Sequence, residues 1–448
     1  MKRGCIGIIV GLLLMTGCSK TDRLVKEIRA IQKEISAITQ TGEVQLLGET
    51  YTLTETGTLP ADGVRELTTM DLSVVRSQAA SFSDVTSRPL LFRTGWKRSG
   101  VEYHLLLVDE KKGQVSVQKG ILCLPRGGEY AVLSDHSPLT VYRGSSLMVL
   151  DPYRKKIFEW GLNGKFLREI SLNDDMESLW RLRNITGTSS SSGRVLSLAP
   201  RGIFFSIWND LQKSPMDRPQ VTHVDLSSGK KETIFIKGLE NEKNWHALAL
   251  ADNGPRGLVY IPAAEPSLLF IDSKMSLAGC LDLAPLLKEA GLEELYESSQ
   301  YMLEWGDITR ISPNKLLILF PLVFSQEWVT PYTKEGKVDR EKMKETTIQL
   351  FGKREQWSSR YAVLVDTQKQ EVIRQGIFDK AFPTDKLLWI LTHGFTEATL
   401  IVGPEARYLL YLFKNKVPDE KELKRGYTSR ESGPFTYALF IKKTHRSL

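Results

Sequence analysis

The sequence is poor in the residues that build most catalytic and metal sites. It has 6 histidines and 4 cysteines in 448 residues, and no histidine has an H-x-H or H-E-x-x-H partner. No cysteine pair has the spacing of a zinc site, and neither a G-x-S-x-G nucleophile elbow nor a phosphate-cradling glycine loop occurs. We therefore expect no metal, no cofactor and no catalytic residue, and we favour a protein that is not an enzyme.

The N-terminus has a short apolar run after two positive charges. Lys2 and Arg3 precede the run from Ile6 to Met15, which is too short to span a bilayer as a permanent helix. The run ends in Met15-Thr-Gly-Cys18, which resembles a bacterial lipobox, with Met at the place where Leu is usual. The other interpretations are an ordinary secretory signal and a short membrane anchor.

The lipobox resemblance implies that residues 1–17 are a signal peptide and that Cys18 carries lipid, with palmitate-type acyl chains. Ser19 follows in place of Asp, which by the family pattern favours the outer membrane, facing the periplasm or the cell surface. The expected partner at this end is therefore the membrane, held through Cys18.

Removal of the signal peptide leaves little bias in charge and few thiols. The formal charge falls from +7 to +5, which does not indicate a nucleic-acid partner. Only Cys123 and Cys280 then remain as thiols, and both lie in apolar, strand-like contexts. We expect two buried thiols in preference to a disulfide, although the sequence leaves their pairing open.

Residues 18–42 form a predicted stalk helix. Five apolar residues are spaced 4, 3, 4 and 3 apart, with charged residues on the other faces: Leu24, Ile28, Ile31, Ile35 and Ile38. Fewer than three heptads are short for a coiled coil, so we favour a helix that lies on its own domain or on the membrane. The alternative is a short coiled coil through which the chain self-associates weakly.

Beyond Gly42 the pattern changes to short strands and turns. Apolar runs that end in aspartate recur, and turn residues and another strand follow each of them. The aspartates are Asp109, Asp151, Asp225, Asp272 and Asp366, at intervals of 42, 74, 47 and 94 residues. Two intervals are one period of 40–50 residues, the 94 is close to two periods, and the 74 is one long or two short periods. Such periods of short strands predict an all-β fold, a β-propeller.

Residues 147–172 are the template for one blade of this propeller, with predicted turns at Asp151-Pro152 and Asn163-Gly164 between three strands. The chain resembles bacterial lipoproteins with NHL-like, six-bladed propellers over about residues 60–430, and a weaker resemblance to outer-membrane assembly lipoproteins with quinone-type repeats lies in Asp225 to Lys230. Six blades are favoured and five to eight remain open. The propeller domain is placed at 43–448, with a helical insertion near 282–305 and a charged rim insertion near 332–357.

Four residues are candidates for exposure at a binding surface. Trp328 and Trp357 flank the charged insertion, and His246 and His393 lie near predicted strand ends. His104 and His223 lie inside strand runs, where we expect satisfied sheet positions.

The favoured function is a lipid-anchored, non-enzymatic docking platform for an envelope protein or glycan. One alternative is a divalent-metal-dependent hydrolase or lyase of the lactonase type, with its site in the propeller channel. The other is an accessory lipoprotein of outer-membrane assembly. A propeller by itself does not choose among these functions.

Overall fold

The structure of the chain is a computed structural model. It describes residues 26, 29–30, 32–33, 36–59, 90–93, 100–125, 139–142, 146–151, 156–161, 163–171, 194–199, 202–207, 220–225, 228, 230–239, 247–253, 256–262, 267–289, 307–312, 314–321, 333–334, 337–338, 360–377, 396–415 and 435–443.

The described residues are mostly in short antiparallel strands. In chain order these are β1 (Glu43–Leu46), β2 (Glu49–Thr58), β3 (Leu90–Arg93), β4 (Gly100–Asp109), β5 (Gln114–Pro125), β6 (Leu139–Tyr142), β7 (Ser146–Asp151), β8 (Lys156–Gly161), β9 (Phe166–Ser171), β10 (Arg194–Ala199), β11 (Gly202–Ile207), β12 (Gln220–Asp225), β13 (Lys231–Phe235), β14 (Ala247–Asp252), β15 (Leu258–Pro262), β16 (Ser267–Ile271), β17 (Leu277–Asp282), β18 (Asp307–Ser312), β19 (Lys315–Pro321), β20 (Thr333–Lys334), β21 (Lys337–Val338), β22 (Arg360–Asp366), β23 (Glu371–Ile377), β24 (Thr396–Val402), β25 (Tyr408–Asn415) and β26 (Phe435–Lys442).

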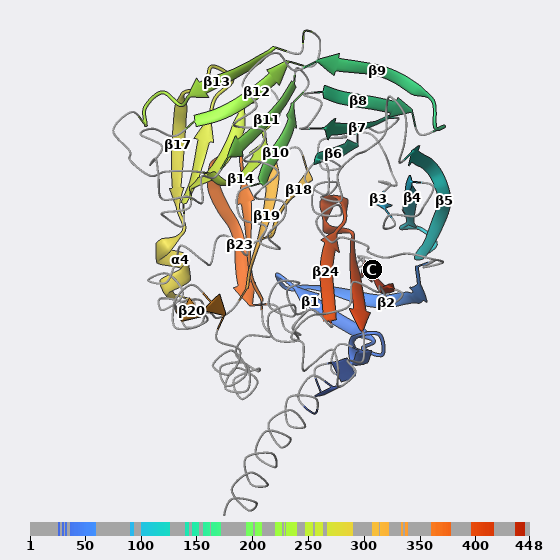
Figure 1. Cartoon of the computed structure of the whole chain (residues 1–448). Coiled ribbons are helices and arrows are strands. Elements are labelled where there is room, and N and C mark those ends of the chain that lie inside the picture. The colour runs from blue at the N-terminus through green and yellow to red at the C-terminus, as the bar shows by residue number, and fades with distance from the viewer. Residues whose placement is uncertain are drawn as a thin grey trace, which may run out of the picture.

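These strands form six larger sheets and one small hairpin within the described ranges. The first sheet is β3-β4-β5, the second β6 to β9, the third β10 to β13, the fourth β14 to β17, and the fifth β18-β19-β22-β23. A closing sheet has the order β1-β2-β26-β25-β24, and β20-β21 is the separate hairpin. The six sheets follow one another around a ring (Figure 1). Consecutive antiparallel sheets arranged in a ring are the architecture of a β-propeller, as the sequence predicts.

The closing sheet takes strands from both ends of the chain. Strand β2 pairs with β26 along its length, with a bulge between Leu53 and Glu55. Its inner part is buried along Leu400–Val402 of β24, Tyr408–Phe413 of β25 and Tyr437–Phe440 of β26. The resemblance covers about residues 60–430, so β1, β2 and β26 extend the fold beyond both of its limits. The ring is thus closed by hydrogen bonds between segments that the sequence keeps far apart.

Neighbouring sheets meet where the outermost strand of one contacts the outer turn of the next. After β13, Lys237 accepts a hydrogen bond from Leu277 N–H at 2.8 Å and donates to Met275 O at 3.0 Å. Ile236 and Leu239 enter the apolar core of the fourth sheet beside Tyr260, which is fully buried. At the next junction a Cβ on Gly279 would lie 1.8 Å from Gln370 Oε1, so β17 lies directly against the turn after β22.

Two more junctions flank the closing sheet, and in the second of them the contact is made by β2, which lies inside the edge strand β1. Arg374 of β23 donates to Glu49 Oε1 at 2.8 Å and to Leu47 O at 3.3 Å, at the turn between β1 and β2. Strand β2 in turn contacts the first sheet, where Glu55 accepts a hydrogen bond from Val115 N–H. Strands at or next to the outer edge therefore carry the polar and backbone contacts that join one sheet to the next.

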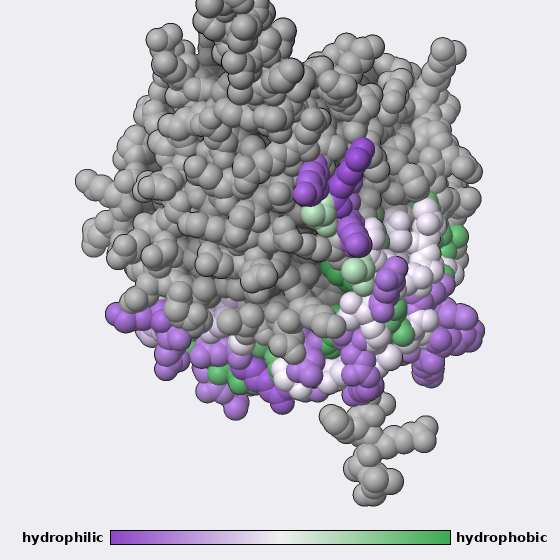
Figure 2. All heavy atoms as spheres, turned by 90° about the horizontal axis from the view of Figure 1, so that it is seen from below, coloured by the Kyte–Doolittle hydropathy of each residue, from purple (hydrophilic) through white to green (hydrophobic). Residues whose placement is uncertain are grey.

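Outward-facing positions of the ring are mainly polar. Seen from below, the described surface is largely hydrophilic, with hydrophobic residues scattered among polar ones (Figure 2). The exposed large apolar residues among those described are Leu167, Phe235 and Ile373, each on the outermost strand of a different sheet. Single apolar residues at such positions are ordinary for a folded protein.

The structure corrects the predicted spacing of the blades. Asp272 and Asp366 belong to consecutive sheets, so their 94-residue interval is one lengthened period and not two. The interval contains helix α4 (Ala284–Glu289) and the hairpin β20-β21. The 74-residue interval runs from the second strand of the second sheet to the third strand of the third sheet, so it is one period and one further strand.

The predicted insertions are described only in part. Helix α4 begins after Asp282, whose Oδ1 accepts a hydrogen bond from Ala284 N–H at 2.8 Å, and Leu287 is its buried residue. Residues 290–306 and 339–359 lie outside the described residues. The boundaries 282–305 and 332–357 therefore remain predictions.

The prediction of two buried thiols is wrong for Cys280. This residue is exposed, because exposure alternates along β17, the outermost strand of the fourth sheet. Apolar neighbours in the sequence indicate burial on an inner strand, whereas an outer strand has a solvent-facing side. The side chain of Cys123, in β5, lies outside the described residues.

Candidate functional site

The candidate residues from the sequence are not among those that the structure describes. Cys18, His246, Trp328, Trp357 and His393 all lie outside the described residues. The same holds for Leu24, Ile28, Ile31 and Ile35 of the stalk, whereas Ile38 is helical and half-buried. Their predicted roles remain predictions. Among the described residues, polar groups gather in two places, the hairpin β12-β13 and the turns around Arg256.

Two histidines occupy sheet positions, as expected. His104 is 5% exposed in β4. His223 lies in β12 directly opposite Glu232 of β13, and its Nδ1 is 3.4 Å from Glu232 Oε1. Cross-strand pairs of this kind stabilise a hairpin. Neither histidine converges with a second imidazole among the described residues, in which no cluster of three or more metal-ligating side chains occurs.

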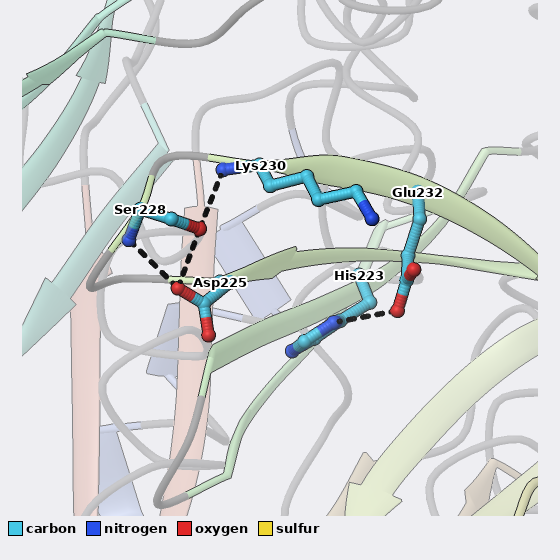
Figure 3. A network of polar contacts seen from close by, with 5 residues as sticks. All are labelled: His223, Asp225, Ser228, Lys230 and Glu232. Carbon is cyan, nitrogen blue, oxygen red and sulfur yellow. Dashed lines mark hydrogen bonds and ion pairs between the residues drawn. The ribbon is translucent and has the colours of Figure 1, made fainter.

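The hairpin β12-β13 carries the most concentrated polar network in the third sheet (Figure 3). Asp225 Oδ1 accepts two hydrogen bonds from Ser228, one from its N–H at 2.7 Å and one from its hydroxyl at 2.8 Å. Ser228 Oγ accepts a further bond from Lys230 N–H at 3.2 Å, and Asp225 N–H donates to Lys230 O at 2.9 Å.

This combination of Ser, His and carboxylate does not have the geometry of a nucleophilic triad. In a triad the serine hydroxyl donates to the histidine, whose other nitrogen bonds the carboxylate. Here the hydroxyl of Ser228 donates to Asp225, while His223 contacts a different carboxylate, that of Glu232. The network therefore shapes and closes the hairpin, which is a structural task.

The recurring aspartates perform the same task elsewhere. Asp109 Oδ1 accepts from the N–H groups of residues 111 and 112, Asp272 Oδ1 from those of 274 and 276, and Asp366 Oδ1 from those of 368 and 369, at 2.8–3.1 Å. These hydrogen bonds hold the pKa of Asp109 and of Asp366 below the usual range, the largest cause being the backbone N–H of residues 112 and 369 respectively. The prediction that the motif aspartates form turns is confirmed at these positions.

The template stretch needs a correction in its register. Asp225, Asp272 and Asp366 stand at the end of the third strand of a four-stranded sheet, whereas Asp151 ends the second strand, β7. The turn after the third strand, β8, is made by Asn163, whose Oδ1 accepts a hydrogen bond from Lys165 N–H at 3.0 Å. The mismatch arises because β7 and β8 are both short strands followed by a turn, so the sequence alone does not number them.

A second polar cluster joins the fourth and fifth sheets. Arg256, between β14 and β15, donates from Nη2 to Asn314 Oδ1 at 2.7 Å, to Thr367 Oγ1 at 3.3 Å and to Asn253 Oδ1 at 3.5 Å. Asn253 and Thr367 are 4% and 3% exposed, and Thr367 N–H also donates to Asn314 O at 2.8 Å. Three turns from two sheets thus converge on one guanidinium.

Sequence reasoning missed the Arg256 cluster because its members are 58 and 111 residues apart. The local signal is Asn253 and Gly257, which flank a tight turn. Gly257 has φ +109°, and a Cβ there would lie 2.0 Å from Ile271 O. Only glycine fits this conformation and this space. The three acceptors of the guanidinium are neutral oxygens, and, besides the backbone hydrogen bonds, the positive charge of Arg256 also helps to lower the pKa of the Asp366 carboxyl. Arg256 therefore joins the fourth sheet to the fifth.

No family model matches the chain, and no curated protein matches it. Among solved structures, a DUF4221 family member from Bacteroides vulgatus is 11% identical with a TM-score of 0.39, covering 90% of this chain and 99% of that one. A putative exported protein from Bacteroides fragilis is 12% identical with a TM-score of 0.32, covering 78% and 92%. AztD from Citrobacter koseri is 7% identical with a TM-score of 0.29, covering 79% and 74%. Likenesses at this level say nothing of what the present chain binds.

Within the described part of the chain, no helix has both the length and the apolar character needed to cross a bilayer.

Proposed function

We propose that this protein is a lipid-anchored propeller of the cell envelope that acts as a non-enzymatic docking platform for a protein or glycan partner. Each of the six larger sheets is one blade, and the closing sheet is the sixth. In this proposal the lipid on Cys18 tethers a closed ring to the outer membrane, and the ring holds its partner by surface contact.

The observation that carries the proposal is the closing sheet. Its edge strand β1 begins at Glu43, close behind the segment that bears the lipobox resemblance. Strand β2 then pairs with β26, so the strands that follow the predicted stalk helix are part of the ring. A tether built into the closing sheet supports a platform held at the membrane.

The use of polar groups within the ring also supports a scaffold. The repeated aspartates close turns, Arg256 joins two sheets, and Glu55 joins the closing sheet to the first. The repeated motif, an apolar run that ends in aspartate, thus has a structural role in forming the turns of the ring. Docking would then fall to aromatic side chains beside the insertions, Trp328 and Trp357, with His246 and His393 as further candidates.

Anchoring is tested by intact mass and labelling of the protein made in its own envelope. We expect the wild-type chain to lose residues 1–17, gain acyl mass and incorporate labelled palmitate, and we expect Cys18→Ala to do none of these. A wild-type chain that is exported with an unmodified thiol at Cys18 would exclude the lipid anchor.

Docking is tested by crosslinking in intact envelopes. We expect a Trp328→Ala, Trp357→Ala variant to lose the partner that wild type retains, while Phe235→Ala, which removes an exposed aromatic elsewhere on the ring, keeps it. Hydrolysis by purified wild type that depends on an added divalent metal would overturn the non-enzymatic part of the proposal in favour of a channel-sited enzyme.

A further inference from the structure

Three cations form a stripe on the N-terminal helix. Lys26, Arg29 and Lys33 are helical and exposed, and spacings of three and four residues bring side chains to one face of a helix. We call these residues the basic stripe. Gln32, next to Lys33, is only 7% exposed, so the helix has a covered side and an open side, and the stripe lies on the open one.

The helix is held close to the closing sheet. The last residues described as helical are 36–38, and β1 begins at Glu43. The connection is fixed by Gln40 N–H, which donates to Ala37 O at 3.0 Å, and by Leu53 N–H, which donates to Gly42 O at 2.9 Å. The described end of the helix, residues 36–38, is thus joined to the closing sheet through a short hydrogen-bonded connection.

Cations at the nearby strand ends are used differently. Lys443 pairs with Glu43, Lys442 lies 3.3 Å from Glu49, and Arg374 lies 2.8 Å from the same carboxylate. Among the residues that the structure describes, no carboxylate forms an ion pair with Lys26, Arg29 or Lys33. The charge of the stripe thus remains available to a partner of opposite sign.

The proposed anchor determines which anionic surface lies nearest. Lys26 lies eight positions after Cys18, a distance of about 12 Å along a helix and at most about 28 Å in a fully extended chain. Residues 19–40 carry five cations against three carboxylates, at Asp22, Glu27 and Glu34. Attraction of cations to an anionic bilayer acts within about 10 Å of its surface. A helix with a basic polar face at this distance is suited to lie along the headgroups.

We propose that the basic stripe binds the anionic headgroups of the membrane to which the protein is anchored. This inference rests on the proposed anchoring at Cys18. Lipid attachment would limit how far the ring can move, and the stripe would set the angle at which the ring stands on the bilayer. The closing sheet would then be the sheet nearest to the membrane.

The test uses the chain from Ser19 to Leu448, which retains every residue that the structure describes and has no lipid. Its binding to vesicles of phosphatidylcholine with 30% phosphatidylglycerol, and of phosphatidylcholine alone, is measured by cosedimentation at low salt. We expect binding only to the anionic vesicles. The Lys26→Gln, Arg29→Gln, Lys33→Gln variant should bind on the order of 100-fold more weakly, because each cation near an anionic surface contributes about a factor of five.

The matched control removes three charges that lie in three different sheets of the ring. Lys111, Lys165 and Lys274 are exposed in three separate turns of the ring. Their triple Gln variant has the same net charge as the stripe variant, and we expect its binding within twofold of wild type. Thermal melts of both variants should coincide with wild type, which shows that the ring is intact.

Equal binding by the stripe and control variants would overturn the proposal, as would equal wild-type binding to neutral vesicles. Absence of wild-type binding to either vesicle would also overturn it, and an acidic protein would then be the favoured partner of the basic stripe. Because this chain lacks Cys18, failure here is separate from failure of anchoring. If Cys18 proved unmodified but vesicle binding were intact, the proposed lipid anchor would be rejected and headgroup binding by the basic stripe would be retained.

Discussion

Glu55 is the residue whose loss should open the ring. It follows the bulge in β2, and its carboxylate accepts hydrogen bonds from Val115 N–H in the first sheet and from the Tyr437 hydroxyl in β26 at 3.1 Å. A Cβ on Gly57 would lie 2.5 Å from the same hydroxyl, so the space that the Tyr437 side chain occupies depends on that glycine. One side chain thus joins both strands of the closing pair to the neighbouring sheet.

The magnitude follows from the two hydrogen bonds. Each bond to a charged group contributes roughly 1.5–3 kcal/mol, and water at this half-buried position replaces part of what is lost. We expect Glu55→Ala to lower the free energy of unfolding by about 3 kcal/mol. Tyr437→Phe removes one of the bonds and should cost about 1 kcal/mol. The double variant should cost less than the sum, by about 1 kcal/mol, because the two residues share an interaction.

Urea unfolding followed by tryptophan fluorescence measures these values, and hydrogen exchange in β2 and β26 shows whether the closing sheet opens before the rest. Thr56→Ala is the control, since Thr56 is the exposed neighbour of Glu55 in the same strand. Equal midpoints for Glu55→Ala and Thr56→Ala would refute the reasoning, as would strict additivity in the double variant.

Three further predictions concern turns and titration. Gly257→Ala should lower the free energy of unfolding by more than about 3 kcal/mol in urea titrations, because φ is +109° and the added Cβ would lie 2.0 Å from Ile271 O. Gly164→Ala is the control, since Gly164 has φ +81° but open space around the added Cβ, and it should cost about 1 kcal/mol. Asp366 has a lowered pKa, so the stability that its charged form contributes is present above the ordinary pKa of 3.8 and is lost as the pH falls below it. Between pH 7 and pH 3 the melting temperature of Asp366→Asn should therefore fall less steeply than that of wild type. Burial, and then the charge and hydrogen bond of Glu55, raise the pKa of Tyr437 to about 12, so stability should be full below pH 10 and decline toward pH 12, with a smaller decline in Tyr437→Phe.

The sequence predicts the parts of the fold that depend on local chemistry. An apolar run that ends in aspartate predicts a strand followed by a turn. Asp272 forms such a turn, since its carboxylate accepts two backbone hydrogen bonds from the residues that follow. The number of a strand within its sheet is not a local property, so the similar runs that end in Asp151 and in Asp225 fall on the second strand of one sheet and on the third strand of another. The 94-residue interval was misread as two periods although both predicted insertions, near 282–305 and 332–357, lie inside it and lengthen a single period.

The contacts between sheets are the part that the sequence could not predict. Strands β1 and β2 resemble other short polar strands, and nothing in the sequence of β2, Glu49–Thr58, indicates that it pairs with β26. Likewise Arg256 is one basic residue among 60, and only the ring brings Asn314 and Thr367 to it. Such contacts come from the closure of the ring, so they become visible only with the whole fold.

The pairing of β2 with β26 also has a consequence for how the chain is made. The hydroxyl of Thr54 donates to Leu439 O across a separation of 385 residues, so the closing sheet forms only when nearly all of the protein has been synthesised. Contacts so distant in sequence fold slowly, because a long loop must close before they form. A nascent chain would therefore remain open until late, and a chain that stays open longer can be threaded across a membrane before it folds.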